Sequence, residues 1–202
     1  MDANTLNKVR NFVEGYFQKK NLTCLSYHNI EHTKAVVENT QLIGMASELD
    51  NDQLQIAIIA AWCHDLGYGT GDLAHETESA RLAILLLCDL QFSSDQINAV
   101  VGCINATKIP QKPHSKIEKV LCDADLAHLG SSKYFEISER LRVENEFTRA
   151  KEISRFDWLS ESRAFFEQHQ YFTKFGKNIL EPIKQKNYKS ILIKLNEHAI
   201  AR

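Results

Sequence analysis

The chain has few of the residues that interrupt helices. Only three prolines occur among 202 residues, at positions 110, 113 and 182. Because proline lacks a backbone donor and ends helices, its scarcity leaves long stretches in which helices can run unbroken. The alternation of apolar and polar residues that marks a half-buried strand is also missing, whereas apolar residues recur at i, i+3 and i+4. The sequence therefore predicts an all-α protein.

The chain also lacks long apolar runs and an excess of charge of one sign. No apolar run reaches the roughly 18 residues of a membrane span, and the first residues do not follow the pattern of a secretory signal. The formal net charge is −2, from 24 basic and 26 acidic residues. This balance argues against an extended nucleic-acid or anionic-membrane surface, but it is compatible with a small phosphorylated substrate. We expect a cytoplasmic protein.

Cysteine usage points to the same compartment. The five cysteines are odd in number and form no C-x-x-C pair. Most lie in apolar surroundings, as in Ala-Trp-Cys63 and Leu-Leu-Leu-Cys88. We interpret them as reduced core thiols rather than as disulfides or zinc thiolates.

The apolar periodicity predicts nine helices in a single domain. Their expected ranges are 4–19, 30–48, 52–65, 75–90, 94–107, 115–128, 132–152, 157–174 and 183–198. The segments 50–52, 93–95 and 131–132 supply the capping residues expected before the third, fifth and seventh helices. We expect a core at about 25–130 and a helical C-terminal extension at about 131–202. The aromatic residues of that extension, among them Trp158, Phe165 and Phe166, are interpreted as helix packing rather than as a ligand site.

The most informative feature is the pair His64-Asp65 at the end of the apolar run 54–63. Such a run predicts a buried helix. Aspartate is rarely buried without a partner, and an imidazole beside a carboxylate provides ligands for a divalent cation. The glycine-rich segment 67–72 that follows ends the helix and lets the backbone approach the site closely. It is not a P-loop, since it lacks the G-x-x-x-x-G-K-[ST] pattern and a preceding strand.

Three further segments supply residues of the same chemistry. They are Tyr27-His-Asn-Ile-Glu-His32, His75-Glu-Thr-Glu-Ser-Ala80 and Cys122-Asp-Ala-Asp125. Each places histidine or aspartate beside apolar helical sequence. One such residue alone is usually a satisfied core group, but four sites in one chain favour a metal centre.

The order His32, His64-Asp65, Asp125 in an all-α chain resembles the HD superfamily of metal-dependent phosphohydrolases. Several neighbouring stretches resemble a bacterial branch that is described only as predicted HD-domain phosphohydrolases. These stretches are Tyr27-His28-Asn29, the segment 60–68, His75-Glu-x-Glu-Ser-Ala80, Ala106-Thr107-Lys108, Asp123-Ala-Asp125-Leu-x-x-Leu-Gly130, Leu141-Arg-x-Glu144 and His169-x-Tyr-Phe-Thr173. The resemblance covers about residues 25–175 and implies an HD-domain helical bundle with additional C-terminal helices.

The resemblance implies that His32, His64, Asp65 and Asp125 are the metal ligands. Asp123 competes with Asp125 for the last position, but two residues on a helix differ by about 200°, so both cannot readily face one ion. We choose Asp125 because the last ligand of the family that this chain resembles precedes a hydrophobic or basic position, which is held here by Leu126. The alternative role for Asp123 is a cap or an acceptor for a ligand histidine.

Other residues receive catalytic or substrate roles. Asp65 could bridge to a second metal, and Asp123 or Glu31 could orient the attacking water as a general base. His75, Lys108 and His28 are the expected substrate contacts. The alternative for His75 is a helix-start residue or a second-metal ligand, and for Lys108 it is solvated loop charge.

A different motif overlaps the first ligand. His28-Asn-Ile-Glu-His32 matches the H-x-x-E-H pattern of inverted zinc proteases. That hypothesis leaves His64-Asp65 unexplained. We therefore favour a helix that begins near Asn29 as its cap, with only His32 facing the metal.

The sequence thus predicts a hydrolase that uses metal-activated water to cleave a phosphate ester or anhydride of a nucleotide or similar small molecule. A mixed nitrogen and oxygen ligand set suits Mn²⁺, Fe²⁺, Co²⁺, Ni²⁺ or Zn²⁺ better than Mg²⁺. The alternatives are a non-catalytic metal- or nucleotide-binding module and a di-iron oxygenase of the same fold, for which His75 and His114 would be the extra ligands. A homodimer is compatible with the aromatic C-terminal helices.

Overall fold

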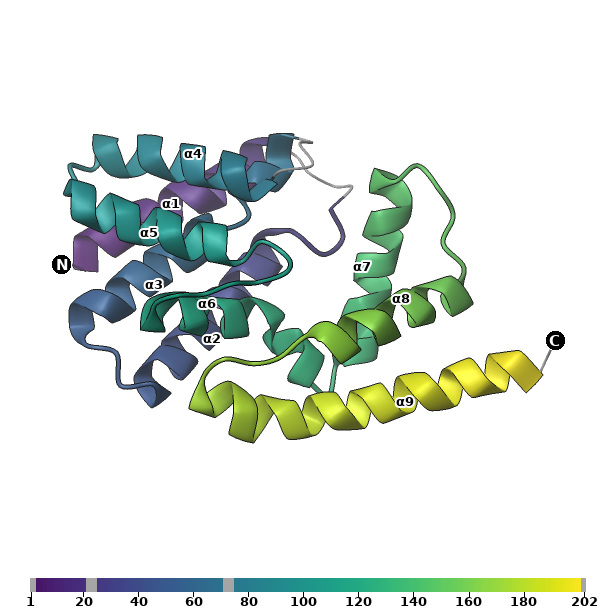
Figure 1. The fold of residues 1–202 in the computed structure, drawn as a ribbon. Coiled ribbons are helices and arrows are strands. Elements are labelled where there is room, and N and C mark those ends of the chain that lie inside the picture. Colours follow the sequence, from purple (N-terminus) through teal and green to yellow (C-terminus); the bar gives the residue numbers. More distant parts are fainter. Residues whose placement is uncertain (1–2, 21–24, 71–74, 201–202) are drawn as a thin grey trace.

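The computed structural model describes residues 3–20, 25–70 and 75–200, and within these residues every regular element is helical (Figure 1). The elements are α1 (Ala3–Lys20), α2 (Ile30–Ala46), α3 (Asn51–Cys63), η1 (Leu66–Thr70), α4 (His75–Asp89), α5 (Ser94–Ala106), α6 (Lys116–Asp125), η2 (Leu126–Gly130), α7 (Tyr134–Thr148), α8 (Arg155–Gln168), η3 (Gly176–Leu180) and α9 (Glu181–Ile200). The predicted all-α class is confirmed.

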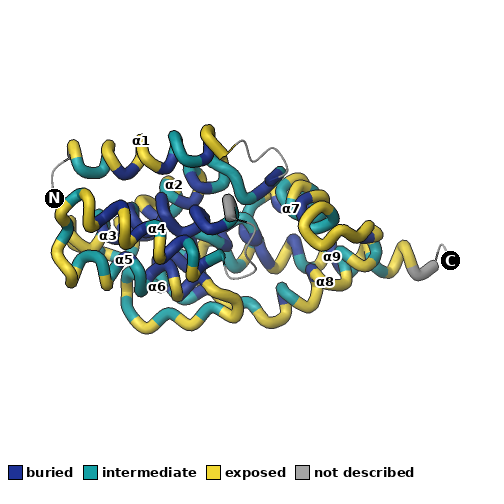
Figure 2. Tube along the Cα trace, turned by 90° about the horizontal axis from the view of Figure 1, so that it is seen from above, coloured by how far each residue is buried: buried dark blue, intermediate teal, exposed yellow. Residues whose placement is uncertain are grey.

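Helix α3 lies at the centre of the larger part of the molecule. It contacts α1, α2, α4, α5 and α6. Its residues from Ala60 to Cys63 are buried, and so are Ile56, Ala57 and Ile59. A helix that is apolar on all faces has to be enclosed by others, which explains why α1, α2 and α4–α6 surround it (Figure 2). Helix α1, which precedes the expected core, contributes Val9, Val13 and Phe17 to this cluster.

A second, smaller apolar cluster joins η2 to the last three helices. Its buried members are Leu126, Leu129, Tyr134, Phe166 and Ile191. The long helix α9 runs below both groups of helices (Figure 1) and contacts η2, η3 and α8. It is fixed to η2 by the Asn187 amide, which donates to the carbonyl oxygens of Leu129 at 2.8 Å and of Ser131 at 2.9 Å.

The predicted helix 157–174 is too long. Helix α8 ends at Gln168, and His169 has the extended backbone angles φ −75° and ψ 137°. The segment 171–175, with aromatic residues at 171, 172 and 175, continues a helix-like pattern. The backbone amides of Phe172 and Thr173 nevertheless donate to the Asp123 carboxylate instead of to a preceding turn. A tertiary contact therefore overrides the local pattern.

Helix capping follows the sequence in part. Asp50 and Ser93 cap α3 and α5 with complete capping boxes, as expected. At α7 the prediction is wrong, because the N-cap is Lys133 and no side chain caps the first turn. Ser131 instead accepts a hydrogen bond from the Lys133 amide at 3.1 Å.

Three of the described cysteines are buried and one is exposed. Cys63, Cys103 and Cys122 are buried free thiols, whereas Cys88 is exposed, contrary to expectation, because its position on α4 faces solvent. Cys24 lies outside the described residues.

None of the described helices combines the length and the apolar character that crossing a membrane requires.

Candidate metal centre and its cavity

The first ligand candidate is placed by a helix cap. Asn29 is the N-cap of α2, and its side chain accepts hydrogen bonds from the amides of Glu31 at 3.0 Å and His32 at 3.3 Å. His32 therefore occupies the first turn, and its side chain is only 7% exposed. The predicted start of this helix is confirmed.

The end of α3 places the second and third candidates. His64 is the C-cap, and its Nδ1 lies 2.9 Å from the carbonyl oxygen of Ala61. Since a carbonyl only accepts, Nδ1 carries the proton and Nε2 keeps its lone pair for the cluster. Asp65 follows directly and is buried.

Gly67 allows the chain to turn tightly after Asp65. A Cβ atom at this position would lie 2.0 Å from the carbonyl oxygen of His75. Its amide donates to the Ser79 hydroxyl at 2.8 Å, which ties the turn to α4. The expected close backbone approach is present at this glycine.

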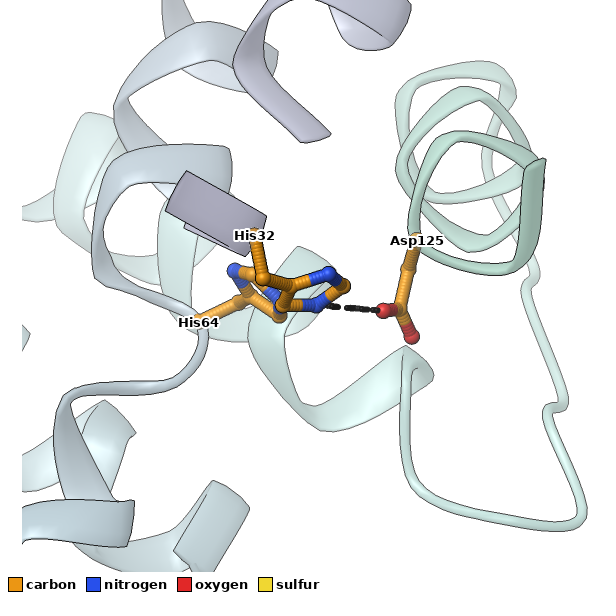
Figure 3. Close-up of side chains that lie close together, drawn as sticks. All are labelled: His32, His64 and Asp125. Atoms are coloured by element: carbon orange, nitrogen blue, oxygen red, sulfur yellow. Dashed lines mark ion pairs between the residues drawn. The ribbon is translucent and has the colours of Figure 1, made fainter. Parts of the chain in front are cut away.

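The end of α6 brings Asp125 to the two histidines (Figure 3). The Asp125 Oδ1 atom lies 3.5 Å from His32 Nε2 and 3.7 Å from His64 Nε2. The Asp65 Oδ2 atom lies 3.3 Å and 3.1 Å from the same two nitrogens. Ligand-type atoms of His32, His64 and Asp125 all lie within 4.8 Å of one another. Side chains from α2, α3 and α6 thus converge at one point.

The ligand-type atoms of this cluster lie close to one another but do not form hydrogen bonds. His32 Nε2, His64 Nε2 and Asp65 Oδ2 are buried and make no hydrogen bond. Buried polar atoms without partners are costly, and three of them facing one another indicate that something else binds there. Imidazole nitrogens and carboxylate oxygens at this spacing fit a divalent cation.

The electrostatics of the cluster agree with this interpretation. Burial lowers the pKa of His64, but the carboxylates of Asp65 and Asp125 outweigh it and hold the pKa well above its usual value. Burial raises the pKa of Asp65, yet the adjacent histidines hold it well below its ordinary value. The carboxylates of Asp65 and Asp125 therefore favour positive charge between them. A divalent cation would supply that charge once the two imidazoles have lost their extra protons.

A cavity of about 400 Å³ opens beside the cluster and is lined by Asp65 and Asp125. Three rings form one of its walls. The His28 ring stacks on Tyr68 at a centroid distance of 3.8 Å and an interplanar angle of 12°, and the Tyr68 ring lies 4.0 Å from that of His75. Asp65 contacts both the ring wall and the metal cluster. Its Oδ1 atom lies 3.9 Å from His75 Nε2, while its Oδ2 atom faces His32 and His64.

Glu144 on α7 holds the loop that carries His28. The backbone amides of Tyr27 and His28 donate to Glu144 Oε2 at 2.7 Å and 3.0 Å, and the His28 Nδ1 atom contacts Oε1. Glu144 is buried, and burial would raise its pKa, but His28 and the two amides lower it below the usual value. The carboxylate therefore fixes the ring so that Nδ1 is engaged and Nε2 is left for the cavity that His28 lines.

Comparison with solved structures gives a match over nearly the whole chain. The chain is similar to a predicted HD superfamily hydrolase from an uncultured Thermotogales bacterium, with a TM-score of 0.60 and 21% sequence identity over 96% of this chain and 91% of that one. The chain shares the all-α fold of that protein. No protein-family model matches the sequence, and no curated protein matches it. In this fold, the side chains of His32, His64, Asp65 and Asp125 lie together.

One residue with an expected catalytic role has other contacts in this structure. The Asp123 carboxylate accepts from the amides of Phe172 and Thr173 at 2.8 Å and 2.9 Å and from the Thr173 hydroxyl at 2.6 Å. Both oxygens are therefore engaged on the side of α6 away from the metal cluster. The geometry therefore does not support Asp123 as a general base, because its carboxylate anchors the segment after α8.

Glu31 and Lys108 do not line the cavity that contains Asp65. The Glu31 side chain is 75% exposed, and its carboxylate lies 3.7 Å from Lys34 Nζ. It borders a separate cavity behind His32. Lys108 is exposed, although its neighbours Thr107 and Ile109 line the main cavity.

The positions of Glu31 and His114 argue against the zinc-protease and oxygenase alternatives. His28 precedes α2, and the exposed Glu31 cannot act beside His28 and His32, so the zinc-protease hypothesis does not fit the described site. His114 is exposed and lines none of the described cavities near the cluster, which removes one of the two extra histidines considered for an oxygenase.

His128 is a cavity residue that the sequence reasoning missed. Its Nδ1 lies 3.0 Å from the Tyr27 hydroxyl and 3.3 Å from the carbonyl oxygen of Asp125. Burial lowers its pKa to about 4. The sequence does carry a signal for it. His128 follows Asp125 by three residues, and residues i and i+3 share a helix face, so both side chains are expected on the same side.

Proposed function

We propose that this protein is a metal-dependent phosphohydrolase that cleaves a phosphate ester of a small molecule such as a nucleotide. One observation carries the proposal: ligand-type atoms of four side chains lie close together, three of these atoms are buried without a hydrogen bond, and two of the side chains, Asp65 and Asp125, line a cavity. The HD fold and the likeness to a predicted hydrolase support it. The phosphate specificity rests on the resemblance of the motifs to HD phosphohydrolases.

His32, His64, Asp65 and Asp125 would hold the cation. Bound there, a divalent cation supplies Lewis acidity that activates water and offsets charge on a phosphoryl group. The two histidines and two aspartates suit Mn²⁺, Fe²⁺, Co²⁺, Ni²⁺ or Zn²⁺ better than Mg²⁺. His64 is pre-oriented for ligation by its bond to the Ala61 carbonyl, so little side-chain freedom is lost on binding.

His28 is the residue best placed to handle the leaving group. Its ring lines the cavity, and Glu144 holds Nδ1, so the other nitrogen can donate a proton to the ester oxygen as the bond to phosphorus breaks. Stacking on Tyr68 fixes the plane of the ring. His75 lies on the same wall and is proposed to contact the phosphoryl group.

A hydrolysis screen with Mn²⁺ tests the proposal directly. The wild type and two variants would be incubated with mono-, tri- and cyclic nucleotides, guanosine tetraphosphate and simple phosphate esters. The variants are Asp65→Ala and, as the control, Asp52→Ala, which changes an exposed aspartate at the start of α3. We expect phosphate release by the wild type and Asp52→Ala but not by Asp65→Ala. Absence of turnover in a folded, metal-loaded wild type would reject the phosphohydrolase and favour a binding module. Oxygen uptake by the iron-loaded protein would favour the oxygenase.

A further inference from the structure

The cavity beside the metal cluster is longer than a phosphate group requires. Its inner end is formed by Asp65, Asp125, His28 and His75. Its outer end is formed by residues of α7 and α8, which stand beside the central group of helices (Figure 1). The outer-end residues are Leu141, Asn145, Arg149, Trp158, Glu161 and Phe165. Its volume of about 400 Å³ lies within the roughly 300–1,000 Å³ that is usual for pockets that bind small organic ligands.

Part of the wall of the outer end is aromatic and is held in place. The Trp158 indole nitrogen donates to the Ser138 hydroxyl at 2.8 Å, which fixes the orientation of the ring. Phe166 and Tyr134 also line the cavity and pack edge to face at 4.9 Å as part of the second apolar cluster. A fixed apolar and aromatic wall that borders an open cavity favours a flat, apolar or aromatic ligand body.

The charges along the cavity point to a substrate with one phosphate. Among the described residues that line it, Arg149 is the one lysine or arginine, and its Nη1 donates to both carboxylate oxygens of Glu161 at 3.2 Å and 3.1 Å. Glu76 adds another carboxylate near the inner end. Extra phosphates beyond the one at the metal cluster would therefore find no unpaired permanent cation in this wall.

We propose that the outer end binds the leaving group of a phosphate monoester whose body is flat, uncharged and about as large as a nucleoside, and that it disfavours substrates with additional phosphates. This inference rests on the proposed phosphohydrolase function for its catalytic part. The binding part concerns α7 and α8 alone and can be measured without turnover.

The test combines binding of the dephosphorylated body with substrate selectivity. Binding of each of the four nucleosides to the metal-free protein would be measured by calorimetry. Hydrolysis of nucleoside 5′-monophosphates, nucleoside triphosphates and glycerol phosphate would be compared with Mn²⁺. Asn145→Trp fills the outer end, and Val143→Trp places the same side chain on the exposed face of α7 as the matched control. Glu161→Lys tests the charge argument.

We expect a nucleoside to bind the wild type and Val143→Trp, with at least about tenfold weaker binding to Asn145→Trp. Monophosphates should exceed triphosphates in kcat/KM, and Asn145→Trp should lose nucleoside monophosphate hydrolysis while it keeps that of glycerol phosphate. Glu161→Lys should raise the triphosphate-to-monophosphate ratio of kcat/KM by about tenfold, since it replaces a repelling charge with an attracting one.

The outcomes separate this inference from the proposed function. Nucleoside binding that Asn145→Trp abolishes, without hydrolysis of any ester, would leave the outer-end site standing and reject the phosphohydrolase. A preference for triphosphates would overturn the inference, and so would equal losses on all esters in Asn145→Trp. Failure of every nucleoside to bind the wild type would overturn it as well.

Discussion

Asp123 and Asp125 lie two residues apart at the end of α6, yet their carboxylates serve opposite sides of the helix. Asp125 Oδ1 faces His32 Nε2 at 3.5 Å, whereas Asp123 accepts three hydrogen bonds from Phe172 and Thr173. Gly176 packs against Asp123 so closely that a Cβ would lie 2.3 Å from Oδ2. One aspartate therefore belongs to the candidate metal centre and the other to the connection between α8 and α9.

We therefore expect asparagine at position 125 to reduce metal affinity and asparagine at position 123 to reduce the stability of the fold. Asp125→Asn should weaken Mn²⁺ binding by more than the ~10–100-fold that loss of an outer partner costs, with little change in the metal-free stability. Asp123→Asn should keep metal affinity but lose about 1–3 kcal/mol of unfolding free energy, because a hydrogen-bonded carboxylate is replaced in a buried site. Metal titration calorimetry and urea unfolding measure the two quantities. Equal losses of metal affinity in both variants would contradict the assignment.

Glu144→Gln is expected to act through His28. The amide cannot hold the imidazole as the carboxylate does, so kcat should fall by about 100-fold while metal content stays unchanged. Esters with a good leaving group, such as nitrophenyl phosphate, should lose much less than alkyl phosphates, because they need little protonation. Metal analysis and kcat for both ester types test this, with Glu139→Gln on the outer surface of α7 as the control. A uniform loss on both ester types would indicate a merely structural Glu144.

Stability at low pH should also depend on Glu144. Its pKa is lowered in the folded protein, because His28 and two amides outweigh the effect of burial. The unfolded chain therefore takes up this proton first as the pH falls. The contribution of the carboxylate is fully present above the unfolded value of about 4.3 and is lost as the pH falls below it. Thermal unfolding of Glu144→Gln from pH 3 to 7 should show a smaller decline at the acid end than the wild type.

His169 should destabilise the fold in mild acid. Burial lowers its pKa to about 3, with a further contribution from Lys184, and neither ring nitrogen has a hydrogen-bond partner. Between about pH 3 and the unfolded value of about 6.5, only the unfolded chain binds the proton, so stability rises with pH over this range and levels off above it. His169→Phe should raise the melting temperature at pH 5 more than at pH 8.

The same substitution at His114, which is exposed, serves as the control for His169. It should leave the pH dependence of the melting temperature unchanged. A wild-type pH dependence retained in His169→Phe would show that His169 is not the responsible group.

Gly67 and Gly15 offer one substitution with opposite expected effects. Alanine at 67 would place its Cβ 2.0 Å from the carbonyl oxygen of His75, a backbone atom that cannot move aside without shifting α4. We expect a loss of about 3 kcal/mol or more and weakened metal binding. At position 15 a Cβ meets nothing within 4 Å, so Gly15→Ala should stabilise the helix by about 0.5–1 kcal/mol. Urea unfolding of both variants tests the pair.

Local patterns were enough to predict the helices and the ligand candidates. The helical spacing, the capping sequences at Asp50 and Ser93 and the apolar run before His64 act within a few residues of chain, so the sequence displays them directly. The four residues that converge at the cluster are each recognisable beside a helix end. The resemblance to a known family rests on the order of these residues along the chain and implies that they bind one metal ion.

The role of a polar residue was less predictable where its partner lies far along the chain. Glu144 is separated from His28 by 116 residues, and Asp123 from Thr173 by 50. Neither contact leaves a periodic signal. The sequence is compatible with Asp123 as a general base, whereas in the fold its carboxylate binds Phe172 and Thr173.

The sequence by itself determined the all-α class, the approximate helix limits and the residue types that can bind a cation, since these depend on short-range spacing. Only the tertiary structure decided which side of α6 each aspartate faces, that Glu144 holds His28, and that α7 and α8 extend the cavity beyond the cluster. Those relationships depend on how whole helices pack against one another. Packing is set by the combined shape of many side chains, which no single segment of the sequence specifies.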